Sequence, residues 1–560
     1  MYVNNRLRST LLVLGAATLA QAAPPFAWQV VVNNAEVVPG DTRTFNSYNQ
    51  PSVNAKRLVV IRARSKGGKT GEPAHGVFLR DMALGTPLVT LFDRTTQVPN
   101  PNNLQSTFVE PPSIPRIDMF TNTVASRANH QPSWKYLLPD GLTETRAGTA
   151  GIYTNPFGPL IAGASNLGIV PDFGFYAVPG HAGVKFDVFP GAPAVTNGST
   201  LVFKGNFSLP DPVTPGAVIS KTGVYFRNLK NADLPLADGS MIGPSGGTKA
   251  VTLIADTDCT IPGTTVKFGS TAPPSAAGFL AVFAGFDNED HPTKGGIYLA
   301  PLLWAKPPLL PLVKIGGQVP GEAKGVGFNK LGEGLSFDGR FVAFWGAWGT
   351  ETKALTLQCP TDGNKDVLAF CREQYPNGYA TTVPVHQGIF VHDILTGATR
   401  VVAKTPTDFD DFVYWNFSGL VPGTGSSDES GEPARWRSAS FVALSGLVDG
   451  SLLDSNAHVA FKARRGLAVD GTYLDVVDGL YLRKVGPTSS TFVPIVTSGM
   501  DGTLIDPAAV DPLTGDHLPV TAMGLERDGF RGNALAVTVT MATEAAGWAG
   551  VYLTTASNDL

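Results

Sequence analysis

A short pattern recurs seven times along this chain: glycine, then Ile, Val or Leu, then Tyr or Phe, then Leu, Val, Phe or Thr. The copies begin at Gly76, Gly151, Gly223, Gly296, Gly388, Gly479 and Gly550. Subtracting these residue numbers gives intervals of 75, 72, 73, 92, 91 and 71 residues. A strand-forming pattern that returns at a fixed interval indicates a repeat architecture. We therefore expect a series of similar β-rich units.

Each copy lies among other strand-like segments. An apolar segment such as 280–285 precedes it, another such as 312–315 follows it, and a shorter one such as 326–328 opens the next unit. Several units also contain a Val-Pro or Ile-Pro step that ends a strand, because proline removes a hydrogen-bond donor. Four strands per unit in radial repetition predict an all-β fold, a seven-bladed β-propeller of four-stranded antiparallel blades.

The two ends of the chain supply complementary parts of one blade. The copy at Gly550 corresponds to a third strand, and the segment 28–32 has the features of the fourth strand that should follow it. We expect this N-terminal strand to pair into the last blade and close the ring, which removes a free sheet edge. An array of β-sandwiches or a β-solenoid is the alternative, although sandwiches need more strands per unit and solenoid repeats are shorter.

Residues 1–22 have the features of a secretory signal peptide: Arg6 and Arg8, an apolar run over 11–19, and an Ala-Gln-Ala cleavage site. Residues 23–560 are expected to form a single propeller domain with an insertion at about 350–387, where the intervals lengthen. No membrane span is expected, because the apolar run is too short. The protein is predicted to be secreted, into the periplasm or the extracellular space.

The chain is slightly acidic. Its formal net charge is −4, or about −6 without Arg6 and Arg8, which argues against a non-specific nucleic-acid binder. Cys359 and Cys371 are twelve residues apart on the insertion, and export permits a disulfide between them. Cys259 is left over and is expected to be a buried small apolar residue.

The face of the ring where the second strand of each blade joins the third is called here the loop face. Its connections in the first two units, 62–75 and 122–150, are rich in cations and aromatic residues. Such loops on a rigid scaffold often carry function, and these residue types suit a sugar ring that bears a carboxylate or sulfate. The candidate ligand-binding residues are Arg62, Arg64, His75, Arg127, His130, Trp134 and Lys135, with Lys66 and Lys69 beside them. A solvated rim is the competing interpretation.

If the chain is an enzyme, His130, Arg127 and Tyr136 are the candidate catalytic residues. His130 could act as the general base, Arg127 could neutralise a uronate carboxylate, and Tyr136 could protonate the leaving oxygen. This is the chemistry of β-elimination. An ordinary exposed loop is the alternative.

Asp362, Asn364 and Asp366 place oxygen ligands at alternating positions, as at the start of a calcium loop. Ca²⁺ is the only cofactor that the sequence suggests. The segment lacks the glycine and the distal glutamate of an EF-hand, so a polar hairpin tip between the two cysteines is the alternative.

The repeat unit resembles secreted bacterial propeller-like proteins of unknown function, which carry repeated Gly-Ile-Tyr and Ile-Ala-Asp-Thr…Ile-Pro-Gly phrases. Its best copy here runs over 253–257 and 261–263. The resemblance implies a propeller fold and export, and it implies no activity.

We therefore expect a secreted propeller that binds an extracellular ligand on its loop face, and an acidic carbohydrate fits the cationic and aromatic side chains best. A polysaccharide lyase or glycosidase on the same scaffold is one alternative. A structural or adhesion protein of the cell surface is another.

Overall fold

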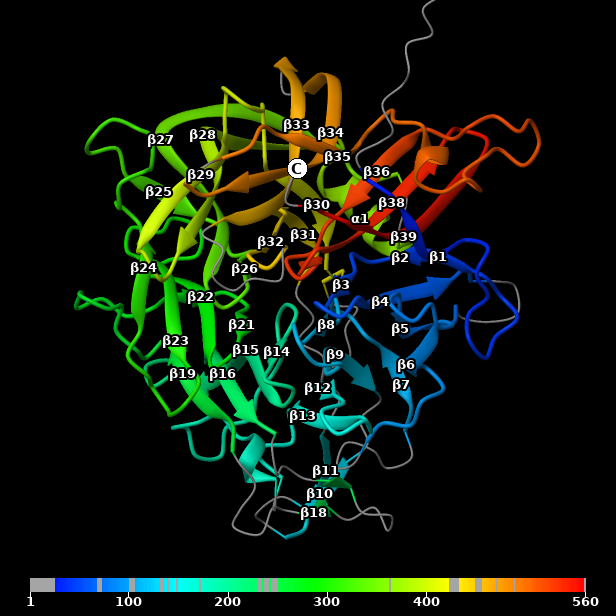
Figure 1. Ribbon diagram of the computed structural model, residues 1–560. Coiled ribbons are helices and arrows are strands. Elements are labelled where there is room, and N and C mark those ends of the chain that lie inside the picture. The colour runs from blue at the N-terminus through cyan, green and yellow to red at the C-terminus, as the bar shows by residue number, and fades with distance from the viewer. Residues whose placement is uncertain are drawn as a thin grey trace, which may run out of the picture.

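The described chain forms a ring of seven antiparallel sheets (Figure 1), so the predicted seven-bladed β-propeller is confirmed. The computed structural model describes residues 26–557 apart from the segments 68–72, 100–105, 131–133, 138–140, 148–149, 171–172, 230–233, 236–240, 243–249, 362–363, 420, 423–432, 449–455, 470–471 and 488. The signal peptide predicted for residues 1–22 lies outside the described residues.

Each sheet is one blade of four strands, and the inner strand of five blades is split into two pieces. Blades 1 and 2 contain β2 (Phe45–Tyr48), β3 (Ser52–Val53), β4 (Leu58–Ser65), β5 (His75–Asp81) and β6 (Val89–Asp93), then β7 (Phe108–Glu110), β8 (Arg116–Ile117), β9 (Val124–His130), β12 (Ala150–Thr154) and β13 (Ile161–Ser165). Blades 3 and 4 contain β14 (Ala194–Thr196), β15 (Thr200–Pro210), β16 (Val218–Asn228) and β19 (Thr252–Asp256), then β20 (Ser270–Thr271), β21 (Ser275–Ala277), β22 (Leu280–Phe286), β23 (Gly295–Pro301) and β24 (Leu310–Lys314).

The remaining blades follow the same order from the channel outward. Blade 5 contains β25 (Phe328–Leu331), β26 (Ser336–Phe337), β27 (Phe341–Leu357), β28 (Tyr379–Asp393) and β29 (Ala398–Lys404). Blades 6 and 7 contain β32 (Val442–Ser445), β33 (Ala457–Val469), β34 (Thr472–Val485) and β35 (Val493–Thr497), then β36 (Val520–Gly524), β37 (Phe530–Arg531), β38 (Ala534–Ala542), β39 (Gly547–Thr555) and β1 (Gln29–Asn33).

Within the part of the chain that the structure describes, three small hairpins and three helical segments lie outside the blades. The hairpins are β10 (Trp134–Leu137) with β11 (Glu144–Ala147), β17 (Leu234–Pro235) with β18 (Met241–Ile242), and β30 (Tyr414–Ser418) with β31 (Arg435–Ala439). The helices are α1 (Lys365–Gln374) and two 3-10 turns, η1 (Gly174–Tyr176) and η2 (Gly502–Leu504). Within the described ranges, none of them has the length and apolarity needed to cross a membrane.

The inner strands surround a central channel. Each contacts the inner strand of the next blade, in the order β3, β8, β14, β21, β26, β32, β37 and back to β3. Seven apolar clusters pack the interior, one at each interface between neighbouring blades. In Figure 1 the blue first blade accordingly lies beside the red last blade.

The repeated pattern lies on the third strand of every blade. Its glycine and its aromatic residue are two positions apart and share one face of the strand. A Cβ added to Gly223 would lie 2.5 Å from the hydroxyl oxygen of Tyr225, and one added to Gly550 would lie 2.7 Å from that of Tyr552. The aromatic ring therefore covers the glycine, which explains why the two residues recur together.

The predicted closure through the N-terminal strand is confirmed. Strand β1 pairs antiparallel with β39 as the outer strand of blade 7, from Gln29 opposite Leu553 to Asn33 opposite Gly550. The pairing is irregular where Tyr552 follows Val551, and blades 1 to 6 have the same irregularity at the same point of the repeat. Strand β1 therefore pairs with the third strand of its blade in the same way as the fourth strand of every other blade does.

Blade 5 carries the insertion expected at about 350–387. It consists of the far halves of β27 and β28, which pair beyond the blade, and of α1 at the tip. The predicted disulfide is confirmed, because Cys359 is bonded to Cys371 with their Cα atoms 5.9 Å apart. Cys259 is free, but it is half-buried rather than buried as expected.

A buried ionic network closes the channel near the turns that join the first and second strands. Arg116 of blade 2 contacts Asp528 of blade 7 and donates to Ser275 Oγ of blade 4 at 3.1 Å. Arg531 of blade 7 contacts the same carboxylate and donates to the Leu444 carbonyl of blade 6 at 2.9 Å. Blades that are not neighbours meet only across the channel, so this network is a plug.

Candidate functional site

The second strand of blade 1 ends in two arginines. Arg62 and Arg64 lie on β4, and Arg64 is opposite His75, the first residue of β5. The sequence predicted a loop over 62–75, and this extent is wrong because the two strands continue into the segment. Hydrogen bonding within the sheet therefore fixes the backbone of all three residues.

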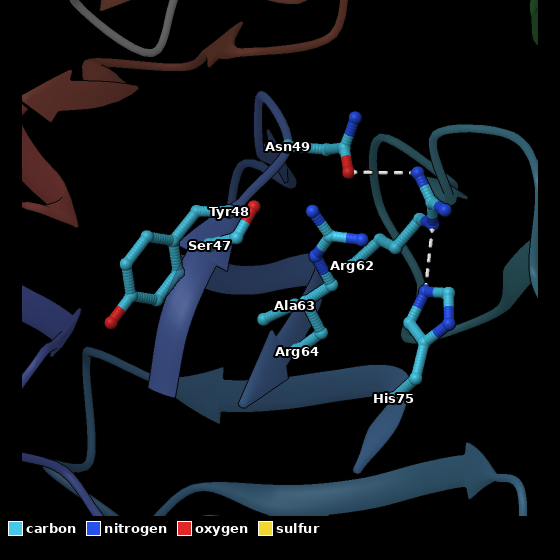
Figure 2. Close-up of a pocket in the computed structure, with 7 residues that line it drawn as sticks. All are labelled: Ser47, Tyr48, Asn49, Arg62, Ala63, Arg64 and His75. Carbon is cyan, nitrogen blue, oxygen red and sulfur yellow. Dashed lines mark hydrogen bonds between the residues drawn. The ribbon is translucent and has the colours of Figure 1, made fainter. Parts of the chain in front are cut away.

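Arg62, Arg64 and His75 line a pocket of about 250 Å³, shown in Figure 2. The rest of the lining comes from the neighbouring inner strand and from β4, through Ser47, Tyr48, Asn49 and Ala63. The pocket therefore lies between the first two strands of blade 1, at the loop face.

Arg62 is held in place by three hydrogen bonds. Its Nη1 donates to Asn49 Oδ1 at 2.9 Å, and its Nε donates to His75 Nε2 at 3.1 Å (Figure 2). Its Nη2 donates to Glu110 Oε1 at 2.8 Å. Glu110 belongs to β7 of blade 2, so this ion pair crosses the blade interface and orients the guanidinium.

His75 is a neutral acceptor in this arrangement. Burial, together with the nearby charges of Arg62 and Arg64, lowers the pKa of its imidazole to about 3. Its Nε2 lone pair accepts the Arg62 Nε proton. The imidazole therefore carries no proton that it could donate from Nε2 at neutral pH.

Arg64 is the open cation of the pocket. Its side chain is exposed, whereas His75 is buried. Among the described residues, none accepts a hydrogen bond from its guanidinium or forms an ion pair with it. The pocket thus combines a guanidinium that is anchored by Glu110 with one that has no partner among the described residues.

The structure does not bring Arg127 and His130 together. Both lie on β9, three positions apart, which places their side chains on opposite faces of the strand. Arg127 Nη1 donates to the Phe189 carbonyl at 3.0 Å, on the side of blade 3. His130 is 1% exposed and its ring lies 6.5 Å from that of Tyr153, on the side of blade 1.

The other predicted residues of blade 2 lie on a hairpin. Trp134, Lys135 and Tyr136 belong to β10, which pairs with β11. Their side chains lie outside the described residues, as does Lys69, so their part in a site stays a prediction. The predicted loop 122–150 therefore contains strand over 124–130, 134–137 and 144–147.

The predicted calcium ligands lie at the start of α1. Asn364 is its N-cap, and its side-chain oxygen accepts from the backbone amides of Asp366 at 2.9 Å and Val367 at 3.2 Å. The segment is thus a helix start and not the hairpin tip that we considered as the alternative. Asp362 lies outside the described residues, so calcium binding stays a prediction.

A different group of described residues presents possible metal ligands. Atoms of His181, Asp256 and Asp258 lie within 4.8 Å of one another. Lys221 Nζ is 2.9 Å and Lys267 Nζ 3.6 Å from the Asp258 carboxylate. These ammonium groups already neutralise that carboxylate, so the group is an ion-pair cluster.

Asn49 and Glu110 are the partners that sequence reasoning missed. Asn49 is 13 residues before Arg62, and Glu110 is 48 residues after it in another blade. Their only sequence signal is a position on an inner strand of the repeat. Aligning the inner strands of the seven units, rather than the connections, would have placed both beside Arg62.

No protein-family model matches the chain, and no curated protein matches it significantly. Among solved structures it is similar to the polysaccharide lyase Uly1, with a TM-score of 0.38, 9% identity and 93% of each chain covered. It is also similar to a puromycin-hydrolyzing peptidase of Mycobacterium tuberculosis, with a TM-score of 0.33 and 9% identity over 93% of this chain and 62% of the peptidase. A periplasmic gluconolactonase of Pseudomonas aeruginosa gives a TM-score of 0.22 and 13% identity, with 80% of this chain and 99% of that chain covered.

The chain thus spans 62% of the peptidase's length. Likenesses at this level carry no information on activity, so function has to be inferred from this chain's own residues.

Proposed function

We propose that this chain is an exported propeller that binds an acidic carbohydrate in the blade 1 pocket. The observation that carries the proposal is the pair of guanidiniums there. Arg62 is anchored by Asn49 and Glu110, and Arg64 is exposed without a partner among the described residues. A planar guanidinium binds carboxylate or sulfate oxygens through two parallel hydrogen bonds.

The rest of the lining suits the hydroxyl groups of a sugar. Ser47 contributes a hydroxyl and Asn49 an amide beside the two cations. The Tyr48 hydroxyl donates to Asn34 Oδ1 at 3.2 Å, and burial raises its pKa, so it stays neutral. The pocket therefore offers fixed charge for an anionic group and neutral polar groups for hydroxyls.

Binding is favoured over catalysis at this pocket. A proton-transfer residue must be free to exchange its proton with substrate, whereas the Nε2 of His75 is engaged by Arg62. The separation of Arg127 and His130 on opposite faces of β9 also argues against the lyase set that the sequence suggested.

Replacing Arg64 by alanine tests the proposal. A charge-assisted hydrogen bond contributes about 1.5–3 kcal/mol, so the affinity for an oligogalacturonide measured by calorimetry should fall at least about tenfold. Raising the salt concentration should weaken wild-type binding, because screening acts on exposed charges.

Arg372→Ala is the matched control, because Arg372 is an exposed arginine on α1, far from the pocket in sequence. It should bind as the wild type does. Equal affinity of Arg64→Ala and wild type, or equal binding of a neutral oligosaccharide, would overturn the proposal.

A further inference from the structure

The face of the ring opposite the loop face is called here the turn face. There the first strand of each blade turns into the second, and the third turns into the fourth. Among the residues that the structure describes, four phenylalanine or tryptophan side chains are exposed, and all four lie in these turns: Phe120, Phe157, Phe279 and Trp304. Exposed apolar side chains that gather on one face indicate an interaction surface.

These side chains come from the two blades that flank blade 3. Two turns of blade 2 carry Phe120 and Phe157, and two turns of blade 4 carry Phe279 and Trp304. Leu303 lies beside Trp304 in the chain, and all five side chains are between 41% and 63% exposed. The five residues are called here the aromatic patch.

Hydrogen bonds join the turns of blades 2, 3 and 4. Thr123 Oγ1 of blade 2 donates to the Gly198 carbonyl of blade 3 at 2.7 Å, and Asn197 Nδ2 of blade 3 donates to the Gly278 carbonyl of blade 4 at 2.8 Å. The turns that carry the aromatic patch therefore belong to one continuous face.

The backbone that carries the patch is held in place from inside the ring. The buried carboxylate of Asp118 accepts from the Phe120 amide at 2.8 Å and from the Gly198 amide at 2.9 Å. Asn155 Oδ1 accepts from the Val124 amide at 2.7 Å, which ties the two turns of blade 2 together. The aromatic side chains are thus presented on a fixed backbone, which lowers the entropy cost of binding.

The exposed charge around the patch is positive. Lys306 is exposed in the same turn as Trp304, and Lys56 is exposed in the turn that joins the first and second strands of blade 1. Neither ammonium has an ion-pair or hydrogen-bond partner in the described chain. The turns that carry the patch contain one acidic residue, Asp118, and its side chain is buried.

The spacing of the patch favours a membrane surface over a protein partner. The exposed amides of Asn122 and Asn197 lie in the turns between the aromatic residues, so the rings project separately. A protein partner would need one recess for each ring, whereas the interfacial layer of a membrane admits Trp, Phe and Leu singly. Two copies joined through this face would bring their lysines together without an exposed carboxylate in these turns to neutralise them.

We infer that the aromatic patch is a docking surface for the anionic surface of a phospholipid bilayer. The aromatic rings and Leu303 would enter the headgroup layer, and Lys56 and Lys306 would pair with lipid phosphates. The blade 1 pocket lies at the loop face, so it would stay open to solvent on the side away from the membrane. The inference does not depend on what that pocket binds.

Flotation with lipid vesicles tests the inference. The chain is used from Ala23 onward, because the ring is complete from Phe26 and the apolar run over 11–19 would bind lipid by itself. Wild type should float with vesicles of equal parts phosphatidylglycerol and phosphatidylcholine. Phe279→Ala/Trp304→Ala should lower the partition coefficient at least about tenfold. Lys306→Gln should lower it about fivefold on these vesicles and leave binding to pure phosphatidylcholine unchanged.

Matched controls come from the opposite face. Val213→Ala/Leu513→Ala removes two apolar side chains that are 84% and 91% exposed at the loop-face end. Lys294→Gln removes an exposed lysine in the loop-face turn of blade 4. Both controls should float as wild type does. The patch variants should keep the wild-type melting temperature, because exposed side chains contribute little to stability.

Two results would refute the membrane surface: no flotation of wild type with the anionic vesicles, or equal flotation of wild type and Phe279→Ala/Trp304→Ala. Self-association of wild type that this variant abolishes, without lipid binding, would assign the patch to a second copy instead. The variant should bind oligogalacturonide as wild type does, so the membrane surface and the pocket proposal fail separately.

Discussion

Equivalent positions in three successive blades carry a cation. Arg62, Arg127 and Lys204 each lie opposite the residue that follows the repeat glycine. Their surroundings differ: Arg62 is tied to Glu110, Arg127 donates to the Phe189 carbonyl, and Lys204 has no partner in the described chain. At the scale of residues, the partners rather than the residue types decide which charge is available to a ligand.

His75 should make stability depend on pH. Its folded-state pKa of about 3 lies below the ordinary value of 6.5, so the unfolded state takes up the proton first and stability falls as pH drops below 6.5. The loss should reach about 2 kcal/mol at pH 5. Denaturant unfolding of His75→Gln at pH 7 and pH 5 should show a smaller difference than wild type. The same change at exposed His291 should leave the difference unaltered, and equal pH dependence of His75→Gln and wild type would contradict the assignment.

At the scale of elements, the insertion on blade 5 packs against the β30–β31 hairpin, which lies between blades 5 and 6. Helix α1 contacts the β30–β31 hairpin through the rings of Phe370 and Phe417, 6.5 Å apart, and Tyr379 at the start of β28 stacks on Trp436 at 6.2 Å. These contacts join the strand extension of blade 5 to the connection that leads into blade 6. The disulfide closes only the tip of this assembly.

Removing the disulfide should loosen α1 without opening the ring. Closing a loop of about a dozen residues contributes roughly 3 kcal/mol in the chain-entropy model. Hydrogen exchange of the α1 amides in Cys359→Ala/Cys371→Ala should therefore speed up by roughly 100-fold. Amides in β22 and β38 serve as the internal control and should exchange as before. Unchanged exchange in α1 would show that aromatic packing alone holds the helix.

At the scale of the whole molecule, two features keep the ring closed. Strand β1 completes blade 7, and Val31 and Val32 are buried in the cluster shared by blades 7 and 1. The plug links the inner strands of blades 2, 4, 6 and 7 through Arg116, Asp528 and Arg531. Strand β1 therefore holds the ring together at its outer edge, and the plug holds it together at its centre.

Deleting residues 23–40 should open the ring of blades. The two buried valines alone contribute about 4 kcal/mol through burial, and the loss of β1 also leaves the edge of β39 unpaired. Thermal unfolding should show a lower midpoint, and size-exclusion chromatography should show self-association of the exposed edge. Val37→Ala, at a residue that is 51% exposed, should melt like wild type. An unchanged midpoint after the deletion would mean that β1 does not hold the ring.

The fold could be predicted because its signals are local. A glycine and an aromatic residue two positions apart meet on one face of a strand, so their recurrence marks the same strand in every blade. Cys359 and Cys371 are close in sequence, and one short loop brings them together. The N-terminal strand was predictable as well, because counting strands per unit left the last blade one strand short.

Only the tertiary structure decided the candidate sites. Reading 122–150 as a loop suggested that Arg127 and His130 act together, but a strand separates side chains three positions apart onto opposite faces. Two partners of Arg62, Asn49 and Glu110, come from the inner edges of blades, and Glu110 belongs to another blade. Such groupings depend on contacts between distant segments, which no local pattern in the sequence encodes.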